Sequence, residues 1–248
     1  MDKAPLLSIA YHRRHDYAYM EALMIEAAIF DMDGLMFDTQ RIYDEMWSEA
    51  CKKLGVPLKE GLVEDTRGTI GENMYAVIRH YYGSSVDPCL LWEENKRCTY
   101  AALKRSVPKR PGLDELLEWL AAHSVPMAVA SSSEKEIVSH NIRTAKIDHF
   151  FSEVITGDMI RQSKPNPEIF LLAARRLNVS PSHTLVLEDS PNGVKAGCAG
   201  GFITVMVPDV CAPTTELLSM ADACCTSLFE VKTLLEVDRL EKKVPLAH

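Results

Sequence analysis

The chain has 248 residues, 47% of them hydrophobic and 25% charged, a composition ordinary for a globular protein with one large core and a smaller second domain. Its formal net charge of -8 and pI near 5.5 argue against nucleic acid as a partner, because such binding depends on clustered Lys and Arg. No apolar run approaches the roughly 20 residues of a membrane-spanning helix, so no membrane partner is expected.

Residues 1–24 precede the first strand-like run and contain only a short apolar patch, too brief for the core of a signal peptide. We interpret them as an N-terminal extension and a candidate for disorder. The seven cysteines are scattered without a C-x-x-C pair, which is typical of thiols in a reducing cytosol. We therefore expect a cytoplasmic protein. As a separate expectation, the protein is a monomer or a weak homodimer.

The first predicted element is a buried strand at 27–30, AAIF, which leads into the stretch IFDMDGLMFDT. No strand-like run then appears until after Pro108. Three helical patterns occupy this interval instead. The first is the helical spacing of the apolar residues Ile42, Met46, Ala50 and Leu54, and the other two are helical stretches at 73–82 and 90–104. This pattern predicts an all-helical cap domain over 39–108, inserted into a catalytic core made of 25–38 and 109–248.

The remaining elements alternate between short apolar runs and helical stretches. Strands are predicted at 126–130, 153–156, 183–187 and 202–207, and helices at 134–144, 167–177 and 192–199. Runs that are apolar at consecutive positions suit strands buried on both faces. The alternation predicts an α/β fold, a Rossmann-like parallel sheet with helices on both faces.

Ligands of an open parallel sheet bind beyond the carboxyl ends of its strands, so the polar residues just after each run are candidates for a site. These residues are Asp31, Asp33, Ser131, Lys164, Glu188 and Asp189. So many carboxylates at one edge would repel one another unless a divalent cation lay among them, and all-oxygen ligation suits Mg²⁺. Carboxylate-bound Mg²⁺ commonly also binds phosphate, which predicts a phosphorylated small molecule as substrate.

The candidate residues divide into roles by chemistry. Asp31, the first acid after the strand, is a candidate nucleophile that would form an aspartyl-phosphate. Asp33, followed by the permissive Gly34, is a candidate general acid and base. Ser131 and Lys164 would supply a hydrogen bond and a positive charge to the phosphoryl oxygens.

Ordinary structural roles compete with some of these assignments. An Asp-x-Asp-Gly sequence is also typical of a turn. Ser133 stands three residues before Glu136, which predicts a capping box, so we assign Ser133 to the helix and leave Ser131 for phosphate. Asn166-Pro167 predicts an N-cap followed by Pro at the first helical position, and Ser190 is a predicted cap.

Together, these residues resemble the motifs of the haloacid-dehalogenase superfamily, in its branch of phosphatases and β-phosphoglucomutases with a helical cap after the first strand. IFDMDGLMFDT resembles the first motif, Ser131 the second, Lys164 in SKPNPEIF the third and LEDSPNGVKAG the fourth. The resemblance implies that Asp31 and Asp33 perform the chemistry. It also implies that Asp31, the Asp33 carbonyl and Asp189 ligate Mg²⁺ with help from Glu188.

The cap residues are expected to select the substrate. The resemblance places Thr39 at the cap hinge, where relatives contact substrate or support closure, although Thr39 is equally suited to cap the helix that follows. Arg67 and Lys96 are candidates for recognising the distal part of the substrate, with an ordinary surface role as the alternative. A sugar, polyol or nucleotide-like monophosphate is the expected substrate class.

Single positions of this sequence distinguish among the related activities of the family. Asp33 argues against dehalogenase chemistry, and a phosphonatase would need a Schiff-base lysine such as Lys52 or Lys53. The resemblance places a mutase His where this chain has Tyr43, and a mutase Arg where it has Gly71. The sequence therefore favours a phosphatase, with a hexose-phosphate mutase as the alternative.

Two classes outside this family share part of the pattern. A receiver domain also uses strand-end acids, a hydroxyl and a lysine, but it has only about 120 residues and lacks a helical insert. A P-loop kinase is disfavoured because the sequence has no G-x-x-x-x-G-K-[ST] motif.

Overall fold

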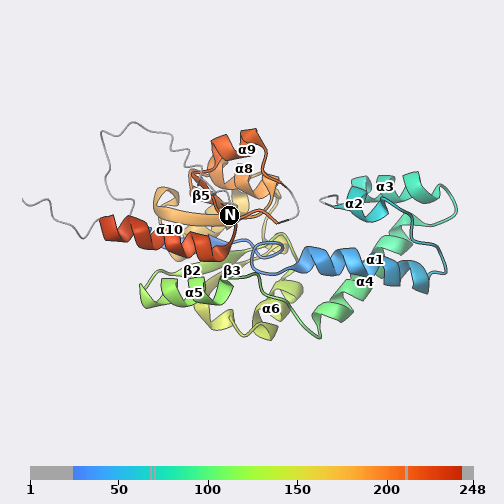
Figure 1. The fold of residues 1–248 in the computed structure, drawn as a ribbon, viewed down its shortest axis with the longest axis horizontal. Coiled ribbons are helices and arrows are strands. Elements are labelled where there is room, and N and C mark those ends of the chain that lie inside the picture. The colour runs from blue at the N-terminus through green and yellow to red at the C-terminus, as the bar shows by residue number, and fades with distance from the viewer. Residues whose placement is uncertain (1–24, 68, 70, 210–211, 242–248) are drawn as a thin grey trace, which may run out of the picture. The chain divides into compact units, whose positions relative to one another are not determined.

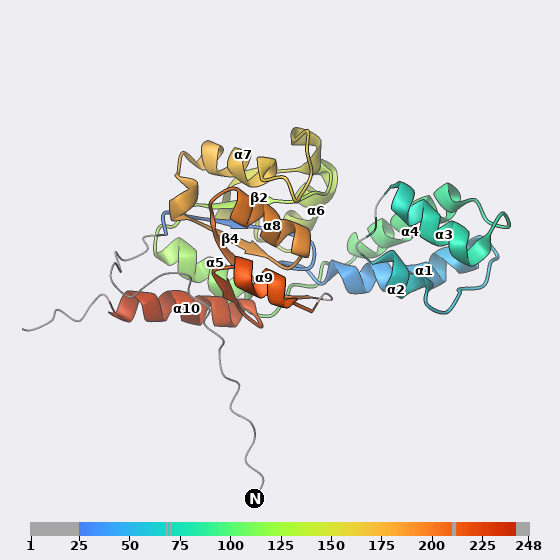
Figure 2. The same cartoon turned by 90° about the horizontal axis from the view of Figure 1, so that it is seen from above.

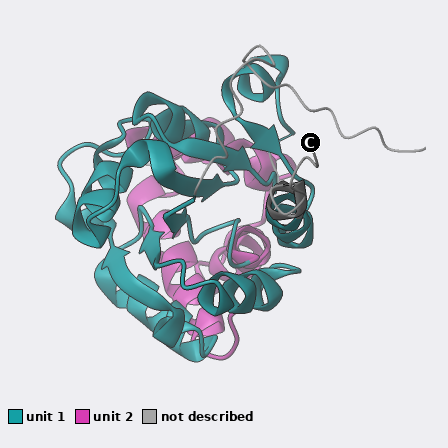
Figure 3. Cartoon of the chain, turned by 90° about the vertical axis from the view of Figure 1, so that its left-hand side faces the viewer, with its two compact units in different colours: residues 1–37, 109–248 teal, residues 38–108 magenta. Residues whose placement is uncertain are grey.

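The structure, a computed structural model, describes residues 25–67, 69, 71–209 and 212–241. The expected N-terminal extension over 1–24 lies outside the described residues. The chain divides into two compact units, Met1–Phe37 with Lys109–His248 and Asp38–Pro108, which are drawn in different colours in Figure 3. The second unit is thus an insertion in the sequence of the first.

The first unit is built on a parallel sheet (Figure 1). Among the described residues, six strands form this sheet, in the order β3-β2-β1-β4-β5-β6. Their bounds are Ala27–Phe30 for β1, Met127–Ala130 for β2, Phe151–Ile155 for β3, Thr184–Glu188 for β4, Ile203–Met206 for β5 and Ala223–Cys224 for β6. The predicted α/β Rossmann-like fold is confirmed, and β6 is a strand that the sequence reasoning did not predict.

Helices cover both faces of this sheet (Figure 2). The α-helices of the unit are α5 Leu113–Ala122, α6 Lys135–Thr144, α7 Glu168–Leu177, α8 Pro191–Ala199, α9 Thr215–Met220 and α10 Leu228–Glu241. Short 3-10 turns lie at Asp148–Phe150, Gly157–Met159 and Pro181–His183. On one face Ile29 and Val186 pack with Phe170 of α7 and Ala196 of α8, all four fully buried. Burial of such apolar surface is the main stabilising term of the unit.

The register of the sheet brings the ends of its central strands level with one another. Phe30, the last residue of β1, is paired with Val129 of β2 and Leu187 of β4. The backbone N–H of Asp31 then donates to the carbonyl of Leu187 at 3.1 Å. Because neighbouring strands lie about 4.8 Å apart, Asp31 and Glu188 become lateral neighbours at one edge.

The inserted unit is helical throughout its described residues. Its helices are α1 Thr39–Lys53, α2 Leu62–Thr66, α3 Glu72–Tyr82 and α4 Pro88–Leu103. Trp47, Leu62, Ile78 and Leu91 contribute to a hydrophobic core of its own. Its role as a cap over the catalytic unit stays a prediction.

No helix in the described ranges is both long and apolar enough to span a membrane.

Candidate active site

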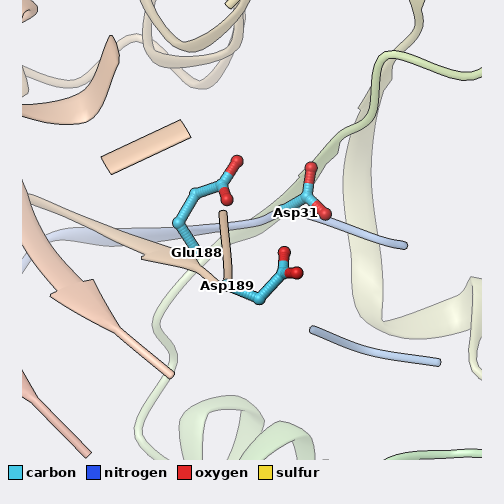
Figure 4. A group of neighbouring side chains, drawn as sticks. All are labelled: Asp31, Glu188 and Asp189. Atoms are coloured by element: carbon cyan, nitrogen blue, oxygen red, sulfur yellow. The ribbon is translucent and has the colours of Figure 1, made fainter. Parts of the chain in front are cut away.

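Three carboxylates gather where β1 and β4 end. Asp31 directly follows β1, Glu188 is the last residue of β4, and Asp189 comes next in the chain. One oxygen from each lies within 4.8 Å of those of the other two, and Figure 4 shows the side chains directed toward a shared space. Asp31 and Glu188 are buried, and Asp189 is partly exposed. The three carboxylates therefore form a candidate cation site.

Lys164 brings a positive charge to the same cluster from the loop before α7. Its Nζ donates to Asp31 Oδ1, to Glu188 Oε1 at 2.5 Å and to the carbonyl of Ala130 at 3.3 Å. The ammonium group also lies 4.8 Å from the centre of the Phe170 ring. Burial acts to lower the pKa of Lys164, but the charges of Asp31 and Glu188 outweigh it and raise that pKa. The lysine is therefore a fixed cation.

The electrostatics of the carboxylates test whether this site suits a divalent metal. Burial raises the pKa of Asp31 from 3.8 to about 8, with Lys164 opposing the shift and Glu188 adding to it. Burial, Glu188 and Asp31 likewise raise the pKa of Asp189 well above its ordinary value, against the opposing charge of Lys164. One ammonium group does not compensate three crowded acids, whereas a divalent cation among them would. The donor set, all oxygen, fits Mg²⁺.

Two glycines allow the acids to approach one another closely. Gly34 has φ +88°, and a Cβ at this position would lie 2.3 Å from Asp189 Oδ2. A Cβ at Gly193 of α8 would lie 1.8 Å from the carboxyl carbon of Glu188. Side chains at either position would displace a member of the cluster, so both positions require glycine for this arrangement.

This charge pattern makes the stability of the metal-free protein depend on pH. Between about pH 4 and 8 the folded protein retains a proton on Asp31 that the unfolded chain has released, so rising pH favours unfolding. In chelator, we expect the free energy of unfolding to fall across this window and the fall to be smaller in Asp31→Asn. We also expect Mg²⁺ to raise the melting temperature more at pH 8 than at pH 6.

Urea titrations at several pH values, with and without Mg²⁺, measure these differences. A free energy of unfolding that rises with pH by the same amount in both proteins would contradict the expectation.

Asp33 is held by two serines that follow β2. Its Oδ2 accepts hydrogen bonds from Ser133 Oγ at 2.8 Å and from Ser131 Oγ at 3.4 Å. The backbone N–H of Ser133 in turn donates to Ser131 Oγ at 3.1 Å. The assignment of Ser133 to a capping box is wrong, because the N-cap of α6 is Glu134 and makes no side-chain cap bond. Ser133 thus contacts a candidate catalytic residue, a contact that the sequence reasoning missed.

Loss of the Ser133 hydroxyl should therefore impair catalysis more than stability. A hydrogen bond to a charged group contributes about 1.5–3 kcal/mol, so Ser133→Ala should lower kcat by about 10-fold or more. The exposed neighbour Ser132 provides the matched control, since Ser132→Ala should leave kcat within about twofold. Steady-state kinetics and melting temperatures measure both. Equal kcat in the two variants would show that Ser133 does not position Asp33.

The other predicted caps have mixed outcomes. Ser190 is the N-cap of α8, and its hydroxyl accepts from Gly193 N at 3.0 Å, so that prediction is confirmed. Helix α7 begins one residue later than predicted, with Pro167 as its N-cap rather than Asn166. The Asn166 side chain still accepts from Glu168 N at 3.0 Å, which caps the helix from one position further out.

The three candidate substrate residues lie in the inserted unit. Thr39 is the first residue of α1 and is buried, and the N-cap of that helix is Asp38. Arg67 donates to Asp44 Oδ2 from Nη2 at 2.6 Å and from Nε at 3.0 Å. A role for Thr39 and Arg67 in substrate recognition stays a prediction.

Lys96 has two partners within its own helix. It forms an ion pair with Glu93 at 2.6 Å, and its ammonium group lies 5.8 Å from the centre of the Trp92 ring. Its role toward a substrate also stays a prediction.

Known proteins are similar to this chain in sequence and in fold. The model of the haloacid dehalogenase-like hydrolase family matches residues 28–207. The chain is 31% identical over 184 residues to a phosphorylated carbohydrates phosphatase of Thermotoga maritima, covering 72% of this chain and 82% of the relative. It is 34% identical over 198 residues to a probable pseudouridine-5'-phosphatase of Drosophila melanogaster, covering 73% and 80%.

A solved structure from Thermotoga maritima, described as a candidate beta-phosphoglucomutase, has a TM-score of 0.74 and 27% identity. It covers 86% of this chain and 99% of its own. The family match begins within β1, ends just beyond β5 and takes in all the strand-end residues of the site. The chain therefore belongs to the haloacid dehalogenase-like hydrolases.

Proposed function

We propose that the protein is a Mg²⁺-dependent phosphomonoesterase that acts on a small phosphorylated metabolite through an aspartyl-phosphate. The observation that carries the proposal is the convergence of Asp31, Glu188 and Asp189 within 4.8 Å, next to the buried ammonium of Lys164. Membership of a hydrolase family and two phosphatase relatives support it.

The two acids of the first motif have different roles, covalent attack for Asp31 and proton transfer for Asp33. A carboxylate oxygen of Asp31 attacks phosphorus, and the bond from phosphorus to the alcohol oxygen breaks. Asp33 gives its proton to that leaving oxygen. Water then attacks the phosphorus, Asp33 takes up its proton, and inorganic phosphate leaves with Asp31 restored.

The other residues of the site bind and neutralise the phosphoryl group. Asp31, Glu188 and Asp189 would hold Mg²⁺ with the Asp33 carbonyl, and the bound ion would stabilise negative charge on the phosphoryl oxygens. Lys164 supplies a second, permanent positive charge, and Ser131 offers a hydrogen bond. The helical unit, acting as a cap, would exclude bulk solvent while admitting the one water molecule that hydrolyses the aspartyl-phosphate, and its residues would also select the organic group.

The names of two relatives support a proposal for the substrate class. One relative is named for phosphorylated carbohydrates and another for pseudouridine 5'-phosphate. We therefore propose a sugar, polyol or nucleotide-like monophosphate as the substrate. A panel of such monophosphates, assayed for phosphate release with Mg²⁺ and with chelator, tests the proposal. Release that is unaffected by chelation, or no release from any member, would refute it.

A hexose-phosphate mutase is the second candidate, because a protein of 27% identity described as a candidate beta-phosphoglucomutase shares the fold. Departures from the mutase pattern at Tyr43 and Gly71 favour the phosphatase. With β-glucose 1-phosphate and a bisphosphate primer, we expect phosphate release to exceed glucose 6-phosphate formation. The reverse order would identify a mutase.

A further inference from the structure

An ion pair between Arg110 and Asp209 lies on the β5 side of the site. Arg110 Nη1 contacts Asp209 Oδ1 at 2.6 Å, and its Nη2 donates to the carbonyl of Pro208 at 3.2 Å. The Asp209 side chain is 9% exposed and that of Arg110 is 21% exposed. Two charges this well shielded from water interact more strongly than a surface pair. The proposed reaction assigns neither residue a role.

Strand register places Asp209 beside the carboxylate cluster. Glu188, the last residue of β4, is paired with Met206, the last residue of β5. Val207 N continues the ladder by donating to the carbonyl of Glu188 at 2.7 Å, and Asp209 follows two residues later. An acid that no candidate role includes therefore follows the strand next to β4, whose end carries Glu188 and Asp189.

Arg110 also holds the loop on the other side of Asp189. Its backbone N–H donates to the carbonyl of Met36 at 2.9 Å, in the turn that follows the first motif. Two residues earlier in that turn, Gly34 makes the close approach to Asp189. One arginine thus joins the loop after β1 to the loop after β5, and Asp189 belongs to the strand end between them.

We propose that Arg110 and Asp209 are a charge-balanced positioning pair that sets the metal affinity of the site through Asp189. Neither residue touches the reacting atoms. The arginine neutralises the Asp209 charge and fixes the two flanking loops. A bound cation would therefore experience the charge of the three carboxylates of the cluster without an added contribution from Asp209. This inference rests on the proposed function, because it assumes that the cluster binds a divalent cation.

Opposite charge changes at the two positions should have opposite effects. Asp209→Asn leaves an uncompensated arginine near Asp189 and should weaken Mg²⁺ binding about 3- to 10-fold. Arg110→Gln leaves an uncompensated acid and should tighten Mg²⁺ binding by a similar factor, while raising KM for the anionic substrate. The double variant Arg110→Gln/Asp209→Asn should return to within about twofold of the unaltered protein.

Calorimetry of Mg²⁺ binding to the full chain measures these affinities without turnover, and melting temperatures show that each variant folds. Arg110→Lys keeps the charge without the forked geometry and should keep the affinity within about twofold. If the two single variants shift the Mg²⁺ affinity in the same direction, or do not shift it, the inference about Arg110 and Asp209 is overturned while the proposed metal site stands. Absence of Mg²⁺ binding by the unaltered protein would overturn the proposed metal site as well.

Discussion

Substitution of Asp31 by Asn should abolish phosphatase turnover while leaving the fold intact. The amide has nearly the same shape but cannot attack phosphorus to form the acyl phosphate. Removal of a covalent nucleophile in other enzymes lowers kcat by as much as about 10⁶-fold, so we expect a fall of at least about 10⁴-fold here. Phosphate release from p-nitrophenyl phosphate in the presence of Mg²⁺ measures the effect.

The metal-free Asp31→Asn variant should be at least as stable as the unaltered protein at pH 8. Asn removes a buried acid whose pKa is raised to about 8 by burial, against the opposing charge of Lys164. The exposed Asp148 provides a control, because Asp148→Asn should change neither activity nor melting temperature appreciably. Turnover by Asp31→Asn within tenfold of the unaltered rate would show that Asp31 is not the nucleophile.

Substitution of Lys164 by Met should have the largest effect on stability. Methionine retains contact with the Phe170 ring but removes the cation that bonds Asp31 and Glu188. Breaking a buried ion pair by removing one partner typically costs about 3–5 kcal/mol, because the remaining charge is left without compensation. We expect a loss of that size in the free energy of unfolding, measured by urea titration in chelator at pH 8.

Saturating Mg²⁺ should recover much of this loss, since the ion supplies positive charge to the same carboxylates. Catalysis should not recover, because the charge that Lys164 gives to the phosphoryl group would still be missing, and a fall of about 10²- to 10³-fold in kcat is expected. Lys104→Met, at an exposed position after α4, is the matched control. Equal stability loss in the two variants would contradict the central position of Lys164.

The strands and the positions of their polar ends could be predicted because residues adjacent in the sequence determine both. Leu185, Val186 and Leu187 are apolar in succession, a pattern that suits a strand buried on both faces. Helix α5 was missed, although Leu113 and Leu117 stand at helical spacing just after Pro111 and Gly112. Strand β6 has two residues, too few for any periodicity to appear.

The site was harder to predict where its contacts join distant parts of the chain. Ser133 satisfies a local capping rule with Glu136, yet it bonds Asp33, which is 100 positions away. Arg110 and Asp209 are 99 positions apart, and no spacing rule connects them. Such pairings depend on the order of strands in the sheet. No local pattern in a single sequence reveals that order, because it is set by the packing of the whole fold.

The path of the chain around the inserted unit has an evolutionary consequence. Phe37 and Lys109 form an antiparallel bridge within the first unit, and Asp38 N donates to the carbonyl of Pro108 at 3.0 Å within the second. Entry and exit are thus neighbours, so a lineage could exchange, lengthen or remodel the intervening helices without disturbing β1 or β2. Under the proposed function, in which the inserted unit selects the substrate, substrate selectivity could change while the residues at the strand ends stay the same.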